Sequence, residues 1–137
     1  MFWFGRNRPD RLKDFQHELR RGRLARRYQR GLIQVPVAKV VGSVGKAASL
    51  DRRFLPRDGE IDARLRHLRR VNEWGMCALP PVDLYQLGDE YYVVDGHHRL
   101  AVALENRQVE IDAYVTVFEL EPEAAPAYAG GRAAAAS

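Results

Sequence analysis

Five consecutive residues in the second half of the chain could do chemistry together, the segment DGHHR from Asp95 to Arg99. It holds two of the four histidines of the 137-residue chain and follows the β-branched pair Val93-Val94. An aspartate before the start of a helix is typical of an N-cap, after which the first backbone N–H groups have no carbonyl partner inside the helix. These groups and the helix dipole favour a bound anion at such a turn.

Each side chain of this turn suits a phosphate group. Gly96 lets the backbone approach a ligand closely, because it has no Cβ. His97 and His98 can donate hydrogen bonds without carrying a full charge at neutral pH. Arg99 offers a planar fork of donors that matches phosphate oxygens. With Asp95 as the N-cap, the turn predicts phosphate recognition, most naturally on a nucleotide or a phosphorylated substrate.

A purely structural interpretation competes with this one. Asp95 would then be only a cap, His98 a core histidine with a satisfied ring, and Arg99 half of a salt bridge. A zinc site is not expected, because adjacent histidines on a helix diverge by about a hundred degrees and Cys77 is the only cysteine. The single cysteine also argues against a disulfide scaffold and favours the cytoplasm.

A second segment could reach the same ligand, the glycine-punctuated run GSVGKAAS after an apolar stretch. It is not a P-loop, because the first glycine of that motif would fall at Val40 and Ala47 replaces the hydroxyl residue that holds magnesium. A flexible loop is the simpler interpretation. Ser43 and Lys46 are nevertheless candidates for contacts with the phosphates.

The elements that must position these residues are read from apolar periodicity. We expect strands at 32–41, 82–87, 90–94 and 111–120, a helix at 59–74, a short buried helix after the DGHHR turn, and a hairpin turn at Gly88-Asp89. In the helix at 59–74, Asp58 is the expected N-cap and Gly75 the expected stop. His67 lies beside its apolar stripe and is expected to be structural. The order of elements predicts an α+β fold, a small mixed sheet with packed helices.

The charge of the chain is uneven and suggests its division. Residues 1–30 hold ten Lys/Arg against three Asp/Glu, within a chain of net charge +4. We therefore expect a basic helical arm over 1–31, the α+β domain over 32–120, and a low-complexity, disordered tail over 121–137. No apolar run is long enough to span a membrane.

The arm carries arginines at helical spacing. Arg20, Arg23, Arg27 and Arg30 would share one face of a helix and form a stripe suited to the phosphates of DNA or RNA. A solvated polar face is the competing interpretation, and the arm could instead contact a partner protein.

The stretch VVDGHHRLAVALEN resembles the ParB/sulfiredoxin-like superfamily, together with the hairpin VDLYQLGDEYYVV and the preceding helix that ends in Trp-Gly. The resemblance covers roughly residues 33–118. It implies a short α+β fold in which a strand runs into a Gly-x-x-Arg turn and a helix.

Three branches of this family use the turn differently. In ParB proteins Gly-Glu-Arg-Arg binds CTP phosphates, and only Gly96 and Arg99 match it here. In sulfiredoxins the turn is Gly-Cys-His-Arg; since His97 stands in place of the nucleophilic cysteine, repair of sulfinic acid is not expected. ParB-like free serine kinases have Asp-Gly-His-His-Arg, which matches Asp95 to Arg99 throughout.

The kinase resemblance implies that the turn holds nucleotide phosphates, that Asp95 contributes to catalysis, and that a glutamate from an earlier segment acts as base. Glu60 is the candidate for that base, although Asp58 and Asp62 lie close by. A carboxylate that only favours the start of its helix is the alternative role for Glu60.

Three hypotheses of function follow. The first is a domain that binds ATP, ADP or CTP at the turn, with Mg²⁺ bridged to Asp95 and with NTP hydrolysis or phosphoryl transfer left open. The second is a nucleic-acid-associated module that binds backbone phosphates through its arm. The third is a nucleotide sensor or accessory protein without catalysis. No cluster of residues predicts a metal held by the protein alone.

Overall fold

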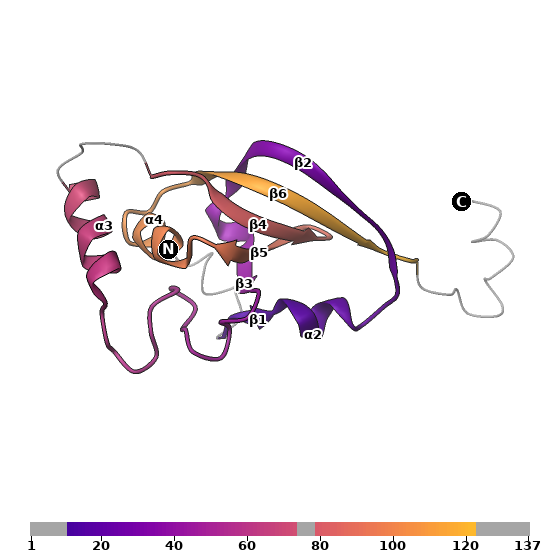
Figure 1. Ribbon diagram of the computed structural model, residues 1–137, viewed down its shortest axis with the longest axis horizontal. Helices are drawn as coiled ribbons and strands as arrows, with labels where there is room; N and C mark the ends of the chain where they lie inside the picture. Colours follow the sequence, from indigo (N-terminus) through magenta and orange to yellow (C-terminus); the bar gives the residue numbers. More distant parts are fainter. Residues whose placement is uncertain (1–10, 74–78, 123–137) are drawn as a thin grey trace, which may run out of the picture.

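The protein is a mixed six-stranded sheet with helices on both faces, as seen in a computed structural model that describes residues 11–73 and 79–122 (Figure 1). Along the chain the elements are β1 (Lys13–Asp14), α2 (Phe15–Leu19), β2 (Leu24–Pro36), the 3-10 helix η1 (Val37–Lys39), β3 (Val40–Ser43), α3 (Ala63–Glu73), β4 (Val82–Leu87), β5 (Glu90–Asp95), α4 (His97–Glu105) and β6 (Glu110–Leu120).

The strands lie in the order β1-β3-β5-β4-β6-β2. The hairpin of β4 and β5 is antiparallel and turns at Gly88, which has a positive φ of 64°. β3 runs parallel to β5, so the carboxyl ends of these two neighbours meet at one edge of the sheet. β2 pairs with β6 alone among the described strands, which makes it the outer strand on its side.

Each face of the sheet has its own apolar core. α3 and α4 cover one face through Leu65, Leu100 and Ala101, which pack with the strand valines and Leu84. α2 covers part of the other face, where Phe15 packs edge-on against Tyr92, with ring centroids 5.3 Å apart, and against Tyr85 and Phe118. Figure 1 shows α3 and α4 together at one end of the molecule. The predicted α+β class and mixed sheet are confirmed.

The second half of the chain follows its sequence pattern closely. The predicted hairpin, the buried helix and the last strand are all present. In β6, Ile111, Ala113, Val115 and Val117 are buried while Asp112 and Tyr114 are exposed, which is the two-faced strand that alternation predicts. Pro36 ends the edge strand β2, at the kind of position that a proline tolerates.

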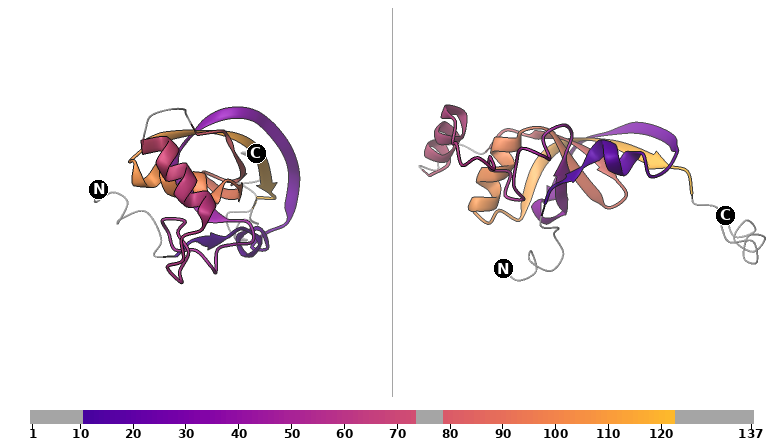
Figure 2. Two further views of the ribbon diagram at one scale, coloured as in Figure 1. Left: turned by 60° about the vertical axis from the view of Figure 1, so that its left-hand side comes forward. Right: turned by 90° about the horizontal axis from the view of Figure 1, so that it is seen from below.

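The prediction of a helical arm over residues 1–31 is wrong for most of its described part. Within residues 11–31 only Phe15–Leu19 is helical, and the chain turns at Gly22 and then enters β2 at Leu24. Leu24 through Pro36 pair instead with β6, and this long-range pairing overrides the local helical spacing. Figure 2 shows β2 curving with β6 around the molecule instead of standing away from it as an arm.

Two further boundaries differ from the expected ones. The strand expected at 32–41 is divided between β2 and β3 by the 3-10 turn Val37–Lys39. The helix expected at 59–74 begins only at Ala63, because Asp62 rather than Asp58 accepts a hydrogen bond from the first turn, from the Leu65 amide at 2.9 Å. Its expected stop at Gly75 and the expected tail beyond residue 122 lie outside the described residues. Among the helices described, none has the length and apolar character needed to cross a membrane.

Candidate functional site

The candidate site begins where β5 passes into α4. Asp95 is the last residue of β5, and the N-cap is Gly96, with φ +110°, rather than the predicted Asp95. A Cβ at Gly96 would lie 2.5 Å from Val82 Cγ1, so both the backbone angle and the packing require glycine. The first helical hydrogen bond runs from Leu100 to Gly96, which leaves the amides of the three preceding residues without a carbonyl partner in the helix.

His97 turns inward from this first helical turn. Its Nε2 lies 2.7 Å from the Ser43 hydroxyl at the carboxyl end of β3, and the Lys46 amide donates to the same hydroxyl at 3.1 Å. Burial, with smaller contributions from the nearby charges of Lys46 and His98, lowers the pKa of His97 to about 4. His97 is therefore neutral at pH 7, and it fixes the start of the loop that follows β3.

Ser43 and Lys46 thus take different places in the predicted site. Ser43 is fully buried and committed to His97, so its hydroxyl acts on the loop and does not reach solvent. Lys46 is exposed, and its ammonium group makes no hydrogen bond or ion pair with any residue in the described ranges. It is near enough to His97 to perturb the pKa of that ring.

His98 turns the other way, to the start of α3. Its Nε2 lies 3.0 Å from Asp62 Oδ2, while the other oxygen of Asp62 accepts from the Leu65 amide. The Leu65 amide and then His98 hold the pKa of Asp62 below its usual range. The carboxylate brought to the turn from the preceding segment is therefore Asp62. The Glu60 carboxylate is exposed and has no hydrogen bond or ion pair within the described part of the chain.

Arg99 lies along the base of the turn. One terminal nitrogen donates to the Pro81 carbonyl at 2.6 Å, and the other pairs with Asp95 Oδ2 at 3.1 Å. The Asp95 side chain is nonetheless 71% exposed. Arg99 thus braces β4 against α4, and the Asp95 carboxylate keeps a free side toward solvent. Sequence reasoning named both residues but not the carbonyl of Pro81 that orients the guanidinium.

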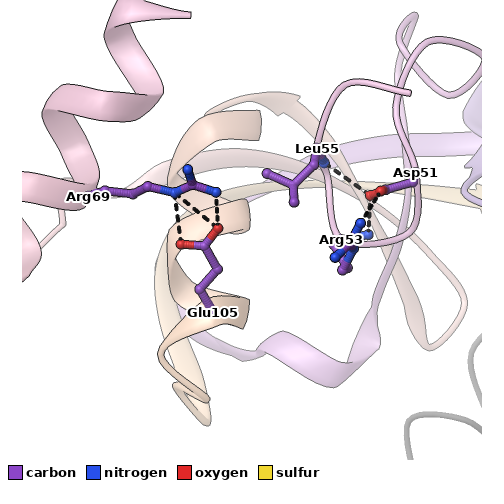
Figure 3. Close-up of polar contacts among 5 residues, drawn as sticks. All are labelled: Asp51, Arg53, Leu55, Arg69 and Glu105. Carbon is purple, nitrogen blue, oxygen red and sulfur yellow. Dashed lines mark hydrogen bonds and ion pairs between the residues drawn. The ribbon is translucent and has the colours of Figure 1, made fainter. Parts of the chain in front are cut away.

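The long connection from β3 to α3 packs against the start of α4. Asp51 accepts hydrogen bonds from the amides of Arg53 and Leu55 at 2.8 and 3.2 Å, and this closes a turn (Figure 3). The turn buries Phe54, whose ring centroid lies 6.4 Å from that of His97. Phe54 has a φ of +63°, which its bulky side chain rarely adopts without strong packing.

A second feature in Figure 3 joins the two helices that flank the site. Arg69 of α3 donates from Nε to both carboxylate oxygens of Glu105 in α4, at 3.1 Å each. This fork-shaped pair fixes the distance between α3 and α4. The pair thereby holds α3, which Asp62 directly precedes, against α4, whose first turn contains His98.

The turn is partly open to solvent, since Asp95 is exposed and His98 and Arg99 are half-buried. Two hollows of about 380 and 800 Å³ lie elsewhere, the first over the sheet face at Tyr85 and Tyr114 and the second beside α2 and the hairpin tip. Neither is lined by a residue of the DGHHR turn. Within the described residues, no group of three or more potential metal ligands comes together.

The four arginines of the predicted phosphate-binding stripe do not form one face. Arg20 and Arg23 lie in the turn before β2, and Arg27 and Arg30 lie within it. Arg23 is 3.8 Å from Glu121, Arg27 lies over the Phe118 ring, and Arg30 donates to Gln86 at 2.7 Å. The helical geometry of the stripe is wrong, because a strand sends neighbouring side chains to opposite faces.

Together the sheet and this corner define an α+β protein with a helix N-terminus at the carboxyl ends of two parallel strands. No family model matches the chain, and no curated protein matches it. Among solved structures it is similar to sulfiredoxin from Arabidopsis thaliana, with 16% sequence identity and a TM-score of 0.41, over 61% of this chain and 82% of that chain. A likeness of this extent carries no argument about activity, and the DGHHR resemblance to one branch stays a prediction.

Proposed function

We propose that the corner at the carboxyl ends of β3 and β5 binds the phosphates of a nucleotide such as ATP, ADP or CTP. The observation that carries the proposal is the hydrogen bond between Ser43 and His97. It holds the loop after β3 against the first turn of α4. Two backbone segments therefore face the same corner, as in the α/β proteins that bind ligands at the carboxyl ends of parallel strands.

In this proposal a phosphate is bound by backbone amides and Lys46, and not by the side chains of His97, His98 and Arg99. The amides of His97, His98 and Arg99 stand free of the helical ladder and supply the positive end of the helix. The Lys46 ammonium supplies a mobile charge from the opposite segment. The rings of His97 and His98 and the guanidinium of Arg99 are occupied by protein partners, so in this proposal they position the turn.

Magnesium fits this corner in one respect. The Asp95 carboxylate is largely exposed beside the free amides, and Mg²⁺ in nucleotide sites is held by one or two carboxylates together with phosphate oxygens. When bound, the ion would neutralise charge on the phosphates. Asp95 would be the protein's ligand to the ion, and Arg99 holds that carboxylate in place.

The first test measures binding. In a thermal-shift panel of ATP, ADP, CTP and GTP with Mg²⁺, one nucleotide at a hundred times its Kd should stabilise the folded protein by about 2.7 kcal/mol. Lys46→Ala should weaken that binding roughly tenfold or more, the effect of losing one charged hydrogen bond. Lys39→Ala is the matched control, because Lys39 is also an exposed lysine, on the turn before β3. Equal binding by the Lys46 variant and the parent would show that the assignment is wrong.

The second test separates turnover from binding alone. In hydrolysis, water attacks the terminal phosphoryl group and the products are a nucleoside diphosphate and orthophosphate. If the protein is an NTPase, Asp95→Asn and Asp62→Asn should lower the release of orthophosphate by more than they lower nucleotide affinity. Glu60→Gln should leave it unchanged, since the Glu60 carboxylate is exposed and makes no hydrogen bond or ion pair with a residue of the turn. Nucleotide binding without product release in the parent would favour a sensor. The nucleic-acid hypothesis stays a prediction, to be tested by the salt dependence of DNA binding.

A further inference from the structure

β2 is the longer of the two edge strands of the described sheet, and its outer edge pairs with no other described strand. β2 has 13 residues and pairs with β6 along one side. All nine residues from Leu24 to Leu32 are exposed. An edge strand directs every second pair of backbone N–H and C=O groups away from its partner, and these groups can pair with a further strand.

The same stretch carries a concentrated positive charge. From Arg20 to Pro36 the chain has six arginines and no aspartate or glutamate. Arg21, Arg23 and Arg26 pair with the carboxylates of Glu18, Glu121 and Glu119. The remaining three arginines, Arg20, Arg27 and Arg30, have no carboxylate partner in the ranges that the structure describes. The edge therefore keeps a net positive charge after its own ion pairs are formed.

Apolar side chains accompany these arginines at regular intervals. Leu24, Tyr28 and Leu32 are 49%, 38% and 53% exposed. Arg26 lies over the Tyr28 ring, 4.6 Å from its centroid, and holds that ring beside the edge. A surface that alternates cations with apolar groups along a strand suits an extended polypeptide whose own side chains alternate acidic and apolar.

We propose that the free edge of β2 docks an acidic, extended segment of a partner protein, which adds to the sheet as a seventh strand. A second copy of this chain is disfavoured as the occupant, because it would bring two arginine-rich strands together. A nucleic acid would use the arginines but not the backbone groups of the edge. The register shifts that flank Arg26–Gln29 bend the strand, so straight pairing is confined to that segment or to Gly31–Pro36.

The test uses the whole chain and a fluorescent ten-residue peptide of alternating glutamate and valine. Binding is followed by anisotropy at low and high salt. The same peptide with lysine in place of glutamate is the charge control. Two further versions carry N-methyl groups on alternate residues, one set on the glutamates and one on the valines. Backbone pairing requires that one set abolish binding and the other leave it nearly unchanged, because only every second amide of an added strand faces β2.

The protein variants are chosen to leave the fold intact. Arg20→Glu removes an arginine whose guanidinium has no partner within the described residues. The double change with Arg27→Glu also removes an arginine that lies over the Phe118 ring and has no carboxylate partner in those residues. The double variant should bind the acidic peptide roughly tenfold more weakly, since it replaces two attractions with two repulsions. Arg64→Glu with Arg70→Glu on α3 is the matched control and should bind like the parent.

Preference for the acidic peptide, loss of binding in the double variant, and sensitivity to one N-methyl set would together support the proposal. Equal binding of the lysine peptide, or equal effects of the two N-methyl sets, would overturn it. Tighter binding of a ten-nucleotide oligothymidine than of the acidic peptide would overturn it in favour of nucleic acid. None of these results depends on nucleotide binding at the DGHHR turn, because that turn joins β5 to α4 and the peptide would bind to β2.

Discussion

Acid should destabilise this protein between pH 7 and pH 5, and His97 should be the cause. The pKa of His97 is lowered by burial from 6.5 to about 4 in the folded state. The unfolded chain therefore binds a proton at pH 5 that the folded protein does not. Because the unfolded state binds more protons, stability falls as the pH falls through this range.

The magnitude follows from the two pKa values. Linkage with an unfolded pKa of 6.5 and a folded pKa of about 4 gives a loss of about 2 kcal/mol between pH 7 and pH 5. The side chain is only 6% exposed and its hydrogen bond to Ser43 is 2.7 Å, so little of this effect is screened by water. For a chain of this size the loss corresponds to a fall in Tm of roughly 8 °C.

The assay is urea unfolding at pH 7, 6 and 5, with the free energy of unfolding extrapolated to water. His97→Gln is the comparison, since its side-chain amide can still meet the Ser43 hydroxyl but does not titrate. The variant should be less stable than the parent at pH 7 and should lose little further stability by pH 5. The carboxylates whose pKa values are lowered, Asp51, Asp62 and Glu119, titrate below this window and affect both proteins alike. A parent curve that is flat from pH 7 to pH 5, or a variant curve with the same slope, would refute the reasoning.

Three other substitutions test the packing around the site. Gly96→Ala forces a Cβ against Val82 at a positive φ and should cost about 2–4 kcal/mol of stability in urea unfolding; a loss below 1 kcal/mol would contradict that geometry. Phe15→Ala removes the centre of the smaller core and should cost about 3–5 kcal/mol by the same measurement. Arg69→Ala breaks a partly exposed pair with Glu105 and should cost only about 0.5–1 kcal/mol, a difference that shrinks at high salt.

The elements predicted correctly are those whose pattern is local. The hairpin is given by two apolar runs around Gly88, and β6 by strict alternation from Ile111 to Val117. The stretch that became β2 has leucine, tyrosine and arginine at spacings of three and four, which also fit a helix. Its pairing with β6 joins residues up to 96 positions apart, Leu24 with Leu120, and no local pattern contains that information.

The sequence pattern located the turn but not the contacts around it. The passage from a strand through Gly96 into a helix follows from the segment Asp95 to Arg99, although the N-cap is Gly96 and not the predicted Asp95. The partners of the histidines do not, because Ser43 lies 54 residues from His97 and Asp62 lies 36 residues from His98. The spacing of Asp62 ahead of Leu65 was a signal for a helix start, and reading it would have placed α3 correctly.

The two adjacent histidines can now be given separate tasks. Neighbouring residues on a helix point about a hundred degrees apart, so one ring can face the sheet while the other faces α3. His97 holds Ser43, where the connection from β3 begins, and His98 holds Asp62, where that connection ends at α3. The pair therefore fixes both ends of a segment that contains Lys46 and buries Phe54 against His97. A ligand at the free amides of α4 would be contacted by backbone whose position both histidines set, which accounts for two of them at this turn without either ring touching the ligand.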